Sequence, residues 1–117
     1  QYTHARIKSI LRKAQQSGYE CKVDSSVEFD PKEIEIIKLM NQYPQRLSDA
    51  GRIYSPAVIA NYAYELAKEF NQYYHDISIL KEEDQAVRSM RLVLIGKIAE
   101  LLTKAMNILG ITLPERM

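Results

Sequence analysis

The apolar residues between positions 87 and 108 recur at spacings of three and four, and this periodicity constrains the fold more than any other feature. In an α-helix such spacing places apolar side chains on one face, which has to be buried. No stretch keeps the two-residue alternation of a half-buried strand for long. The sequence therefore predicts an all-α domain. The buried stripe of this helix is expected to be Val87, Met90, Leu94, Ile98, Leu101, Ala105 and Ile108.

Capping and breaking residues mark the ends of the expected helices. In "DPKE", Asp30 can cap the free backbone N–H groups of a helix that starts at Pro31, and Glu33 completes a capping box. Gly18 and Gly110 suit helix C-terminal ends. The expected helices cover about residues 2–17, 31–43, 44–51, 56–75 and 84–109, and residues 18–30 form a loop with extended backbone near Val23 or Val27.

Each expected helix has an apolar side, so the helices should pack together. We predict a bundle of about five helices, and 117 residues suit one domain, residues 1–117, with a single core. The four tyrosines of the 56–75 segment are expected mainly in packing positions. The other predicted core residues are Ile7, Ile10, Leu11, Ala14, Ile34, Ile37, Leu39, Met40, Ile59, Ala63, Leu66, Ala67, Phe70, Ile77, Ile79 and Leu80.

The formal net charge of +1 conceals an uneven distribution of charge. Residues 1–22 carry five basic residues and one acidic residue, whereas residues 24–40 carry five acidic and two basic residues. Residues 88–104 are basic again, with four cations and one acid. A local positive face is therefore compatible with a nearly neutral chain.

No catalytic or metal-binding arrangement stands out. Cys21 is the single cysteine, and neither His4 nor His75 has a partner at the spacing of a metal site. His4 also lacks the acidic neighbours expected of a phosphate-accepting histidine. The chain shows no secretory leader and no apolar run long enough to cross a bilayer. These features predict a soluble, cytoplasmic monomer that has no catalytic site of its own.

The first helix carries positive charge on both sides of its apolar stripe. A solvated amphipathic helix explains this pattern. A nucleic-acid surface explains it too, because Lys and Arg neutralise phosphates while Tyr or His offers a plane for an unpaired base. Composition does not choose between the two. One flank holds Tyr2, Arg6, Ser9 and Lys13, and the other holds His4, Lys8 and Arg12.

Three stretches of the chain resemble a known family. They are "QYTHARIKSILRKA", "SPAVIANYAYELAKEFNQYYHDISIL" and "RLVLIGKIAELLTKAMNILGITLPERM". Together they resemble the C-terminal anticodon-binding domain of class I arginyl-tRNA synthetases, the DALR domain, over nearly the whole chain. "QYTHAR" and "PERM" are the most specific pieces, because helix formation does not demand them. "EEDQAVRSMRLVL" is the loose counterpart of the DALR signature, and the pairs Val87–Arg88 and Arg91–Leu92 are candidate remnants of it.

The resemblance implies a helical bundle that grips the anticodon stem and loop of arginine tRNA. A catalytic domain upstream would activate arginine with ATP and magnesium, and this domain would need no cofactor. Gln1 would lie inside the longer enzyme, and Met117 would be its natural C-terminal residue. With the basic flanks added, the expected RNA-binding residues are Tyr2, His4, Arg6, Arg12, Lys13, His75 and Met117.

The closing segment "GITLPERM" is expected to be more than a frayed end. Gly110 can end the last helix, and Ile111, Leu113 and Pro114 can hold the segment against the bundle. Deleting Met117 should then weaken RNA binding more than folding.

Two alternatives remain open. One is the anticodon-binding domain of another class I synthetase, such as the cysteine enzyme. The other is a helical protein-interaction module whose basic flanks are merely solvated.

Overall fold

The computed structural model describes residues 2–53 and 55–110, and within these residues the chain is helical, without strands. This confirms the predicted all-α class and the bundle of about five helices. The elements are α1 (Tyr2–Gln16), α2 (Pro31–Met40), α3 (Tyr43–Arg52), α4 (Ala57–Asp76), the short 3-10 helix η1 (Ile79–Lys81) and α5 (Gln85–Ile108).

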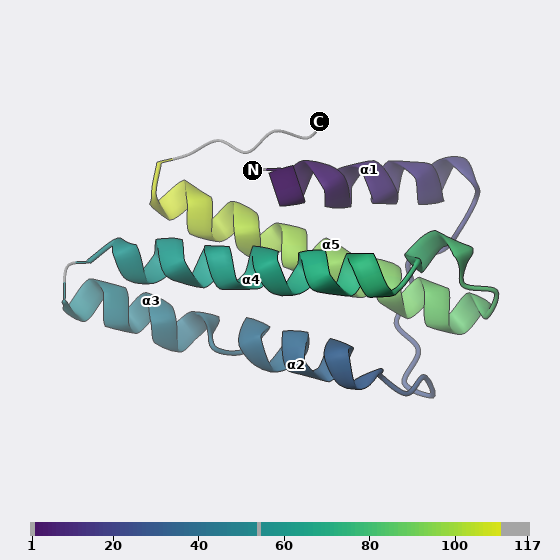
Figure 1. Cartoon of the computed structure of the whole chain (residues 1–117), viewed down its shortest axis with the longest axis horizontal. Helices are drawn as coiled ribbons and strands as arrows, with labels where there is room; N and C mark the ends of the chain where they lie inside the picture. The colour runs from purple at the N-terminus through teal and green to yellow at the C-terminus, as the bar shows by residue number, and fades with distance from the viewer. Residues whose placement is uncertain (1, 54, 111–117) are drawn as a thin grey trace.

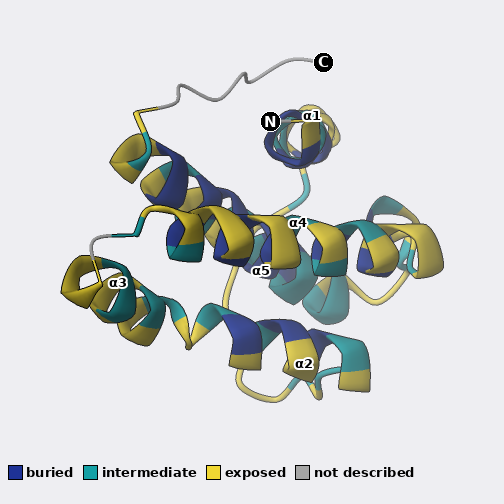
Figure 2. Ribbon diagram, turned by 60° about the vertical axis from the view of Figure 1, so that its left-hand side comes forward, coloured by how far each residue is buried: buried dark blue, intermediate teal, exposed yellow. Residues whose placement is uncertain are grey.

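The helices form three layers (Figure 1). The long helices α4 and α5 run antiparallel and make the middle layer. Helix α1 packs on one side of this pair, and α2 and α3 follow one another along the other side of α4. No residue of α3 is buried, whereas Figure 2 shows dark blue on α1, α2, α4 and α5.

Local sequence explains where the helices begin and end. Asp30 accepts a hydrogen bond from the Lys32 backbone, while the Glu33 side chain accepts one from the Asp30 backbone, so the predicted capping box is present. Asp84 caps α5 through the backbone N–H groups of its first turn. Gly110 has a φ of 78°, the left-handed conformation that a glycine favours after a helix.

The core lies along the seam between α4 and its neighbours. Tyr62, Phe70 and Tyr73 of α4 are fully buried. The Tyr62 hydroxyl donates hydrogen bonds to the backbone carbonyls of Leu39, at 2.7 Å, and Met40, at 3.1 Å. Burial raises the pKa of Tyr62 to about 12. This tyrosine therefore fixes the end of α2 against α4.

The buried faces of α2 and α5 differ from the predicted ones. Ile34 is exposed, and Ile36 takes its place in the core. In α5 the predicted Ile108 is exposed and Leu101 is only partly buried, whereas Leu92 and Leu102 are buried. Helix α5 is apolar around much of its circumference and packs against both α1 and α4, so its periodicity does not define a single buried face.

The corrected face of α5 leads to a test of stability. Leu102→Ala should lower the free energy of unfolding by about 2–5 kcal/mol, because it opens a cavity in the core. Leu101→Ala, on the same helix, should cost clearly less, since its side chain is only partly buried. Urea denaturation of both variants measures the difference. Equal losses would contradict the assignment of Leu102 to the inner face.

Among the described residues, no helix combines the length and the apolar character needed to span a membrane.

Candidate nucleic-acid interface

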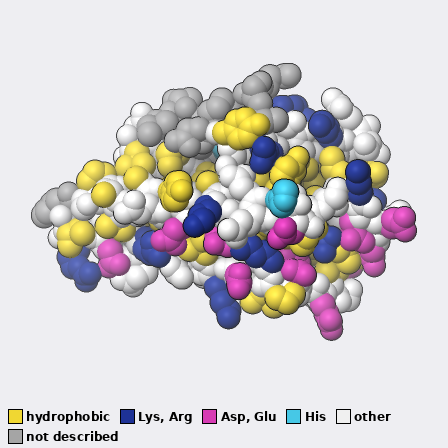
Figure 3. Space-filling model, in the orientation of Figure 1, with side chains coloured by type: hydrophobic (Ala, Val, Ile, Leu, Met, Phe, Trp, Pro, Cys, Tyr) yellow, Lys and Arg dark blue, Asp and Glu magenta, His cyan; other side chains and the backbone are white. Residues whose placement is uncertain are grey.

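The outward side of α1 carries positive charge. This helix contains Arg6, Lys8, Arg12 and Lys13 and no acidic residue. In Figure 3, acidic side chains gather in the lower half of the visible face, towards α2, whereas the upper half shows basic and hydrophobic side chains. The uneven charge of the sequence is thus a separation of charge in space, and the α1 side favours an anionic partner.

Arg6 joins α1 to α4 at the surface. Its guanidinium carbon lies 4.9 Å from the centroid of the Tyr2 ring and 4.6 Å from that of Tyr74. Arg6 also donates hydrogen bonds to the Asn71 side-chain oxygen and to the Tyr2 hydroxyl, both at 3.4 Å. Tyr2 is 60% exposed and Tyr74 41% exposed. One cation therefore holds two accessible aromatic rings in place.

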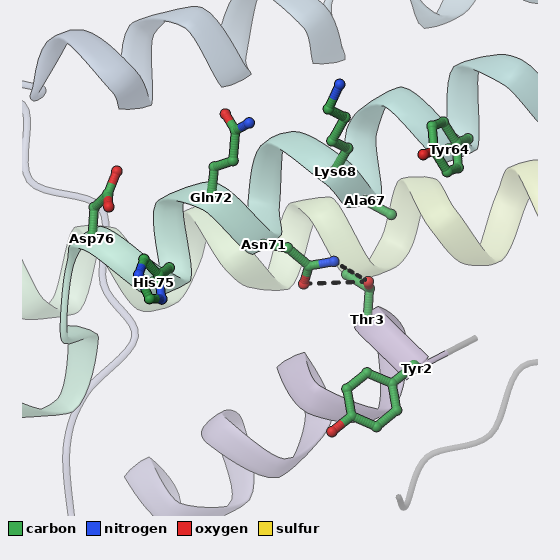
Figure 4. A pocket seen from close by; sticks show the side chains of 9 residues that line it. All are labelled: Tyr2, Thr3, Tyr64, Ala67, Lys68, Asn71, Gln72, His75 and Asp76. Carbon is green, nitrogen blue, oxygen red and sulfur yellow. Dashed lines mark hydrogen bonds between the residues drawn. The ribbon is translucent and has the colours of Figure 1, made fainter.

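A groove of about 710 Å³ runs beside the Tyr2 ring between the start of α1 and the outer face of α4 (Figure 4). Thr3 and Asn71 meet across it, with the Asn71 amide donating to the Thr3 hydroxyl at 3.2 Å. Tyr64, 71% exposed, stands towards one end of the groove. The lining residues are Tyr2, Thr3, Tyr64, Ala67, Lys68, Asn71, Gln72, His75 and Asp76.

The groove combines the groups that unpaired nucleotides require. The exposed faces of Tyr2 and Tyr64 can stack on bases, and the amide nitrogen of Gln72, whose oxygen accepts a hydrogen bond from Lys32 at 3.1 Å, can donate to a base edge. Lys68 supplies a positive charge for a phosphate, whereas Asp76 adds a negative charge to the lining.

The structure brings several of the predicted site residues together. Tyr2, Arg6 and His75 lie on this surface, and His75 is exposed at the groove. Lys13 is exposed on the same flank of α1 as Tyr2 and Arg6, while Arg12 is partly buried on the other flank.

Two predicted residues are not placed on the surface. His4 is only 4% exposed, and its Nε2 atom lies 3.1 Å from the Thr103 hydroxyl of α5. Helical spacing put His4 on an outer flank, but α5 covers that flank, so its ring does not suit stacking on a base. Met117 lies outside the described residues, as does the segment that follows Gly110.

The sequence analysis did not predict most of the residues that α4 contributes to the groove. Of its four tyrosines, Tyr62 and Tyr73 are core residues, as expected, but Tyr64 and Tyr74 are exposed. A signal was present in the spacing, because Tyr64, Lys68, Asn71 and His75 are separated by four, three and four residues. That spacing places them on one face of a helix.

The candidate DALR remnants have structural roles. Arg91 donates hydrogen bonds at 2.9 Å to the carboxylates of Glu33 and Glu82. The Arg88 guanidinium carbon lies 3.6 Å from the centroid of the Tyr19 ring. These contacts tie α5 to α2, to the segment before α5 and to the loop after α1. They stabilise the bundle that supports the groove.

Glu33 is the centre of a buried polar cluster. It is 3% exposed and accepts a 2.5 Å hydrogen bond from the Tyr73 hydroxyl as well as the bond from Arg91. Burial and the bond to Glu33 raise the pKa of Tyr73. Burial alone would lower the pKa of Arg91, but the hydrogen bond to Glu33 and the electrostatic effects of Tyr73, Glu33 and Glu82 together raise that pKa. The cluster fixes the inner side of α4 just before Tyr74 and His75.

Nothing in the described part of the chain resembles a metal centre, since no three His, Cys, Asp or Glu side chains come together there. A helical bundle with a basic helix beside a groove that bears exposed tyrosines has the features of a nucleic-acid-binding domain. The profile of the DALR anticodon binding domain matches residues 1–117. The chain therefore belongs to the family of DALR anticodon binding domains.

Its relatives confirm the resemblance to arginyl-tRNA synthetases. The arginine–tRNA ligase of Porphyromonas gingivalis is 46% identical over 119 residues, covering 100% of this chain and 20% of the relative. The Flavobacterium psychrophilum ligase is 46% identical over 117 residues, covering 100% of this chain and 19% of the relative. The chain thus spans about one fifth of the length of these relatives.

A solved structure has the same fold. The Thermus thermophilus arginyl-tRNA synthetase superimposes with a TM-score of 0.87 and 28% sequence identity. The match covers 99% of this chain and 20% of that one. These relatives favour the arginine enzymes over the cysteine enzyme that the sequence had left open.

Proposed function

We propose that this chain binds the anticodon stem and loop of arginine tRNA and positions that tRNA for a cytoplasmic arginine–tRNA ligase of which it is one domain. The observation that carries the proposal is Arg6, held between the exposed rings of Tyr2 and Tyr74 beside the groove. ATP- and magnesium-dependent aminoacylation belongs to the part of such a ligase that this chain does not match. This domain binds RNA and does not catalyse.

Each side of the interface has a separate task. The cations of α1 and Lys68 of α4 neutralise phosphates of the loop and its stem. Tyr2 and Tyr64 stack on bases turned out of the loop, and the Gln72 side chain reads a base edge. His75 adds a further ring at the other end of the groove. Stacking of bases on tyrosine rings requires unpaired nucleotides, and the anticodon lies in an unpaired loop.

The direct test is binding of the 117-residue chain to an arginine-tRNA anticodon stem-loop, against the same stem-loop with a swapped anticodon. With three or four phosphates contacted, log K should fall with log salt at a slope of about −2 to −3. Fluorescence anisotropy at several salt concentrations measures both quantities. Salt-independent binding, or equal affinity for the swapped anticodon, would contradict anticodon recognition through this surface. A salt-insensitive partner would instead favour a protein-interaction module.

A charge reversal locates the phosphate contacts. Lys13→Glu should weaken stem-loop binding and reduce the salt slope by about one, because Lys13 is exposed on the flank that carries Tyr2 and Arg6. Lys38→Glu is the matched control, since Lys38 is an exposed lysine on α2 in the opposite layer. Equal effects of the two substitutions would mean that binding follows net charge and not the α1 surface.

A further inference from the structure

Asn71 of α4 forms hydrogen bonds with two side chains of α1. Its amide nitrogen donates to the Thr3 hydroxyl at 3.2 Å (Figure 4), and its amide oxygen accepts from Nη1 of Arg6 at 3.4 Å. The Thr3 hydroxyl also lies 3.5 Å from that oxygen. An amide nitrogen donates and an amide oxygen accepts, so both ends of the Asn71 side chain are engaged by α1.

The bond to Thr3 anchors the start of α1. Thr3 is 6% exposed and lies in the first turn of the helix, directly after Tyr2. Helix ends fray, because the first backbone N–H groups have no partner within the helix. A side-chain bond from Thr3 to a neighbouring helix opposes fraying at this position. The backbone that carries the Tyr2 ring is thereby held against α4.

The bond to Arg6 orients the cation that contacts the Tyr2 ring. The donors of a guanidinium lie along the edge of a plane, so an acceptor at that edge fixes the direction in which the plane faces. Asn71 supplies one acceptor and the Tyr2 hydroxyl another, at 3.4 Å each. The Tyr74 ring, whose centroid lies 4.6 Å from the guanidinium carbon, packs against the fully buried Phe70 with 6.0 Å between ring centroids. Arg6 and its two rings are therefore connected to the core.

We propose that Asn71 is a positioning residue for RNA binding. Through Thr3 and Arg6 it holds the Tyr2 ring ready to stack on a base, without contacting the RNA. Its amide is engaged at both ends, so reading a base edge would break bonds within the bundle. A ring that is fixed before the RNA arrives lowers the entropy cost of ordering it on binding. The role in binding rests on the proposed function, whereas the orientation of Arg6 can be tested without RNA.

Nuclear magnetic resonance of the free chain tests the orientation of Arg6. Its side-chain protons should be shifted upfield by the ring currents of Tyr2 and Tyr74. Asn71→Ala should reduce these shifts, because the guanidinium loses an acceptor that fixes it over the rings. Asn61→Ala is the matched control, since Asn61 is an exposed asparagine of α4 outside the groove, and it should leave the shifts unchanged. Unchanged Arg6 resonances in Asn71→Ala would overturn the proposal whatever the RNA result.

Binding of the arginine-tRNA stem-loop tests the positioning role. Asn71→Ala and Thr3→Val should each weaken binding about tenfold, within the range that one stacked base contributes. The salt slope should stay unchanged, because neither residue is charged. Thr3→Ser keeps the hydroxyl and should bind like the unaltered chain. Fluorescence anisotropy measures the affinities, and urea denaturation checks that each variant is folded.

A Tyr2→Ala background separates positioning from direct contact with RNA. Asn71→Ala should add less than about a twofold loss there, because the ring that it positions is gone. A full tenfold loss in that background, or normal binding by Thr3→Val, would overturn the proposal. If the unaltered chain does not bind the stem-loop, the proposed function fails, and the Arg6 resonances still decide whether Asn71 orients the cation. If the unaltered chain binds and Asn71→Ala binds equally well, only the positioning role is wrong.

Discussion

Replacing Arg91 with leucine is expected to lower the free energy of unfolding by about 3–5 kcal/mol, because the Glu33 carboxylate is then buried without its cation. Arg91 is 15% exposed as a side chain and Glu33 4%, with 2.9 Å between the bonded atoms. Tyr73 donates to the same carboxylate oxygen, but one hydroxyl does not compensate a full buried charge. Urea or thermal unfolding followed by circular dichroism measures the loss.

The matched control lies on the same helix. Lys97 pairs with Glu100 at 3.6 Å, and both side chains are 62% exposed. Lys97→Leu should therefore change stability by less than about 1 kcal/mol. A triple variant with Glu33→Leu, Tyr73→Phe and Arg91→Leu should recover much of the loss, since it removes the charge together with its partners. If Arg91→Leu and Lys97→Leu were equally mild, the cluster would not be a stabilising centre.

Replacing Arg6 with glutamate is expected to weaken binding of the arginine stem-loop by about 1–3 kcal/mol, the usual worth of one stacked base, with little loss of stability. The substitution removes a cation from the α1 surface and the support of two rings, those of Tyr2 and Tyr74. Tyr2→Ala should fall in the same range if a base stacks on that ring. Titration of each variant with labelled stem-loop measures the affinity.

Arg52→Glu provides the control for charge reversal. Arg52 is an exposed arginine of α3, in the layer opposite α1, and its partner is Asp49 of the same helix. Its substitution should leave the affinity within a factor of about two, apart from the general effect of net charge. Should Arg6→Glu bind as well as Arg52→Glu at low salt, the surface formed by α1 and α4 would not be the RNA interface.

Helix α4 connects the stable centre of the bundle to the proposed interface. Its inner side holds Tyr62 and Tyr73, whose hydroxyls are bonded to α2. Its outer side presents Tyr64, Lys68 and His75 to the groove. One rigid helix carries both sets of residues. A substitution at Glu33 or Arg91 is therefore expected to shift the groove residues of α4 as well as to lower the free energy of unfolding.

The positions of the helices could be read from the sequence because their signals are local. The capping box at Asp30, the cap at Asp84 and the left-handed Gly110 involve only neighbouring residues. The family could be recognised from short stretches such as "QYTHAR". The α1 side of the interface could also be predicted from the sequence, since the basic flank with Tyr2 and Arg6 is a property of one helix.

What the sequence by itself determined was therefore each helix, its charge and its membership of the DALR family. Tertiary structure alone decided which faces meet. It buried His4 under α5, replaced Ile34 by Ile36 in the core, and turned Tyr64 and Tyr74 outward beside α1. The physical reason is that periodicity reports a helix's own apolar side, whereas burial depends on which partner covers it. A groove made by two helices has no signal in either one alone.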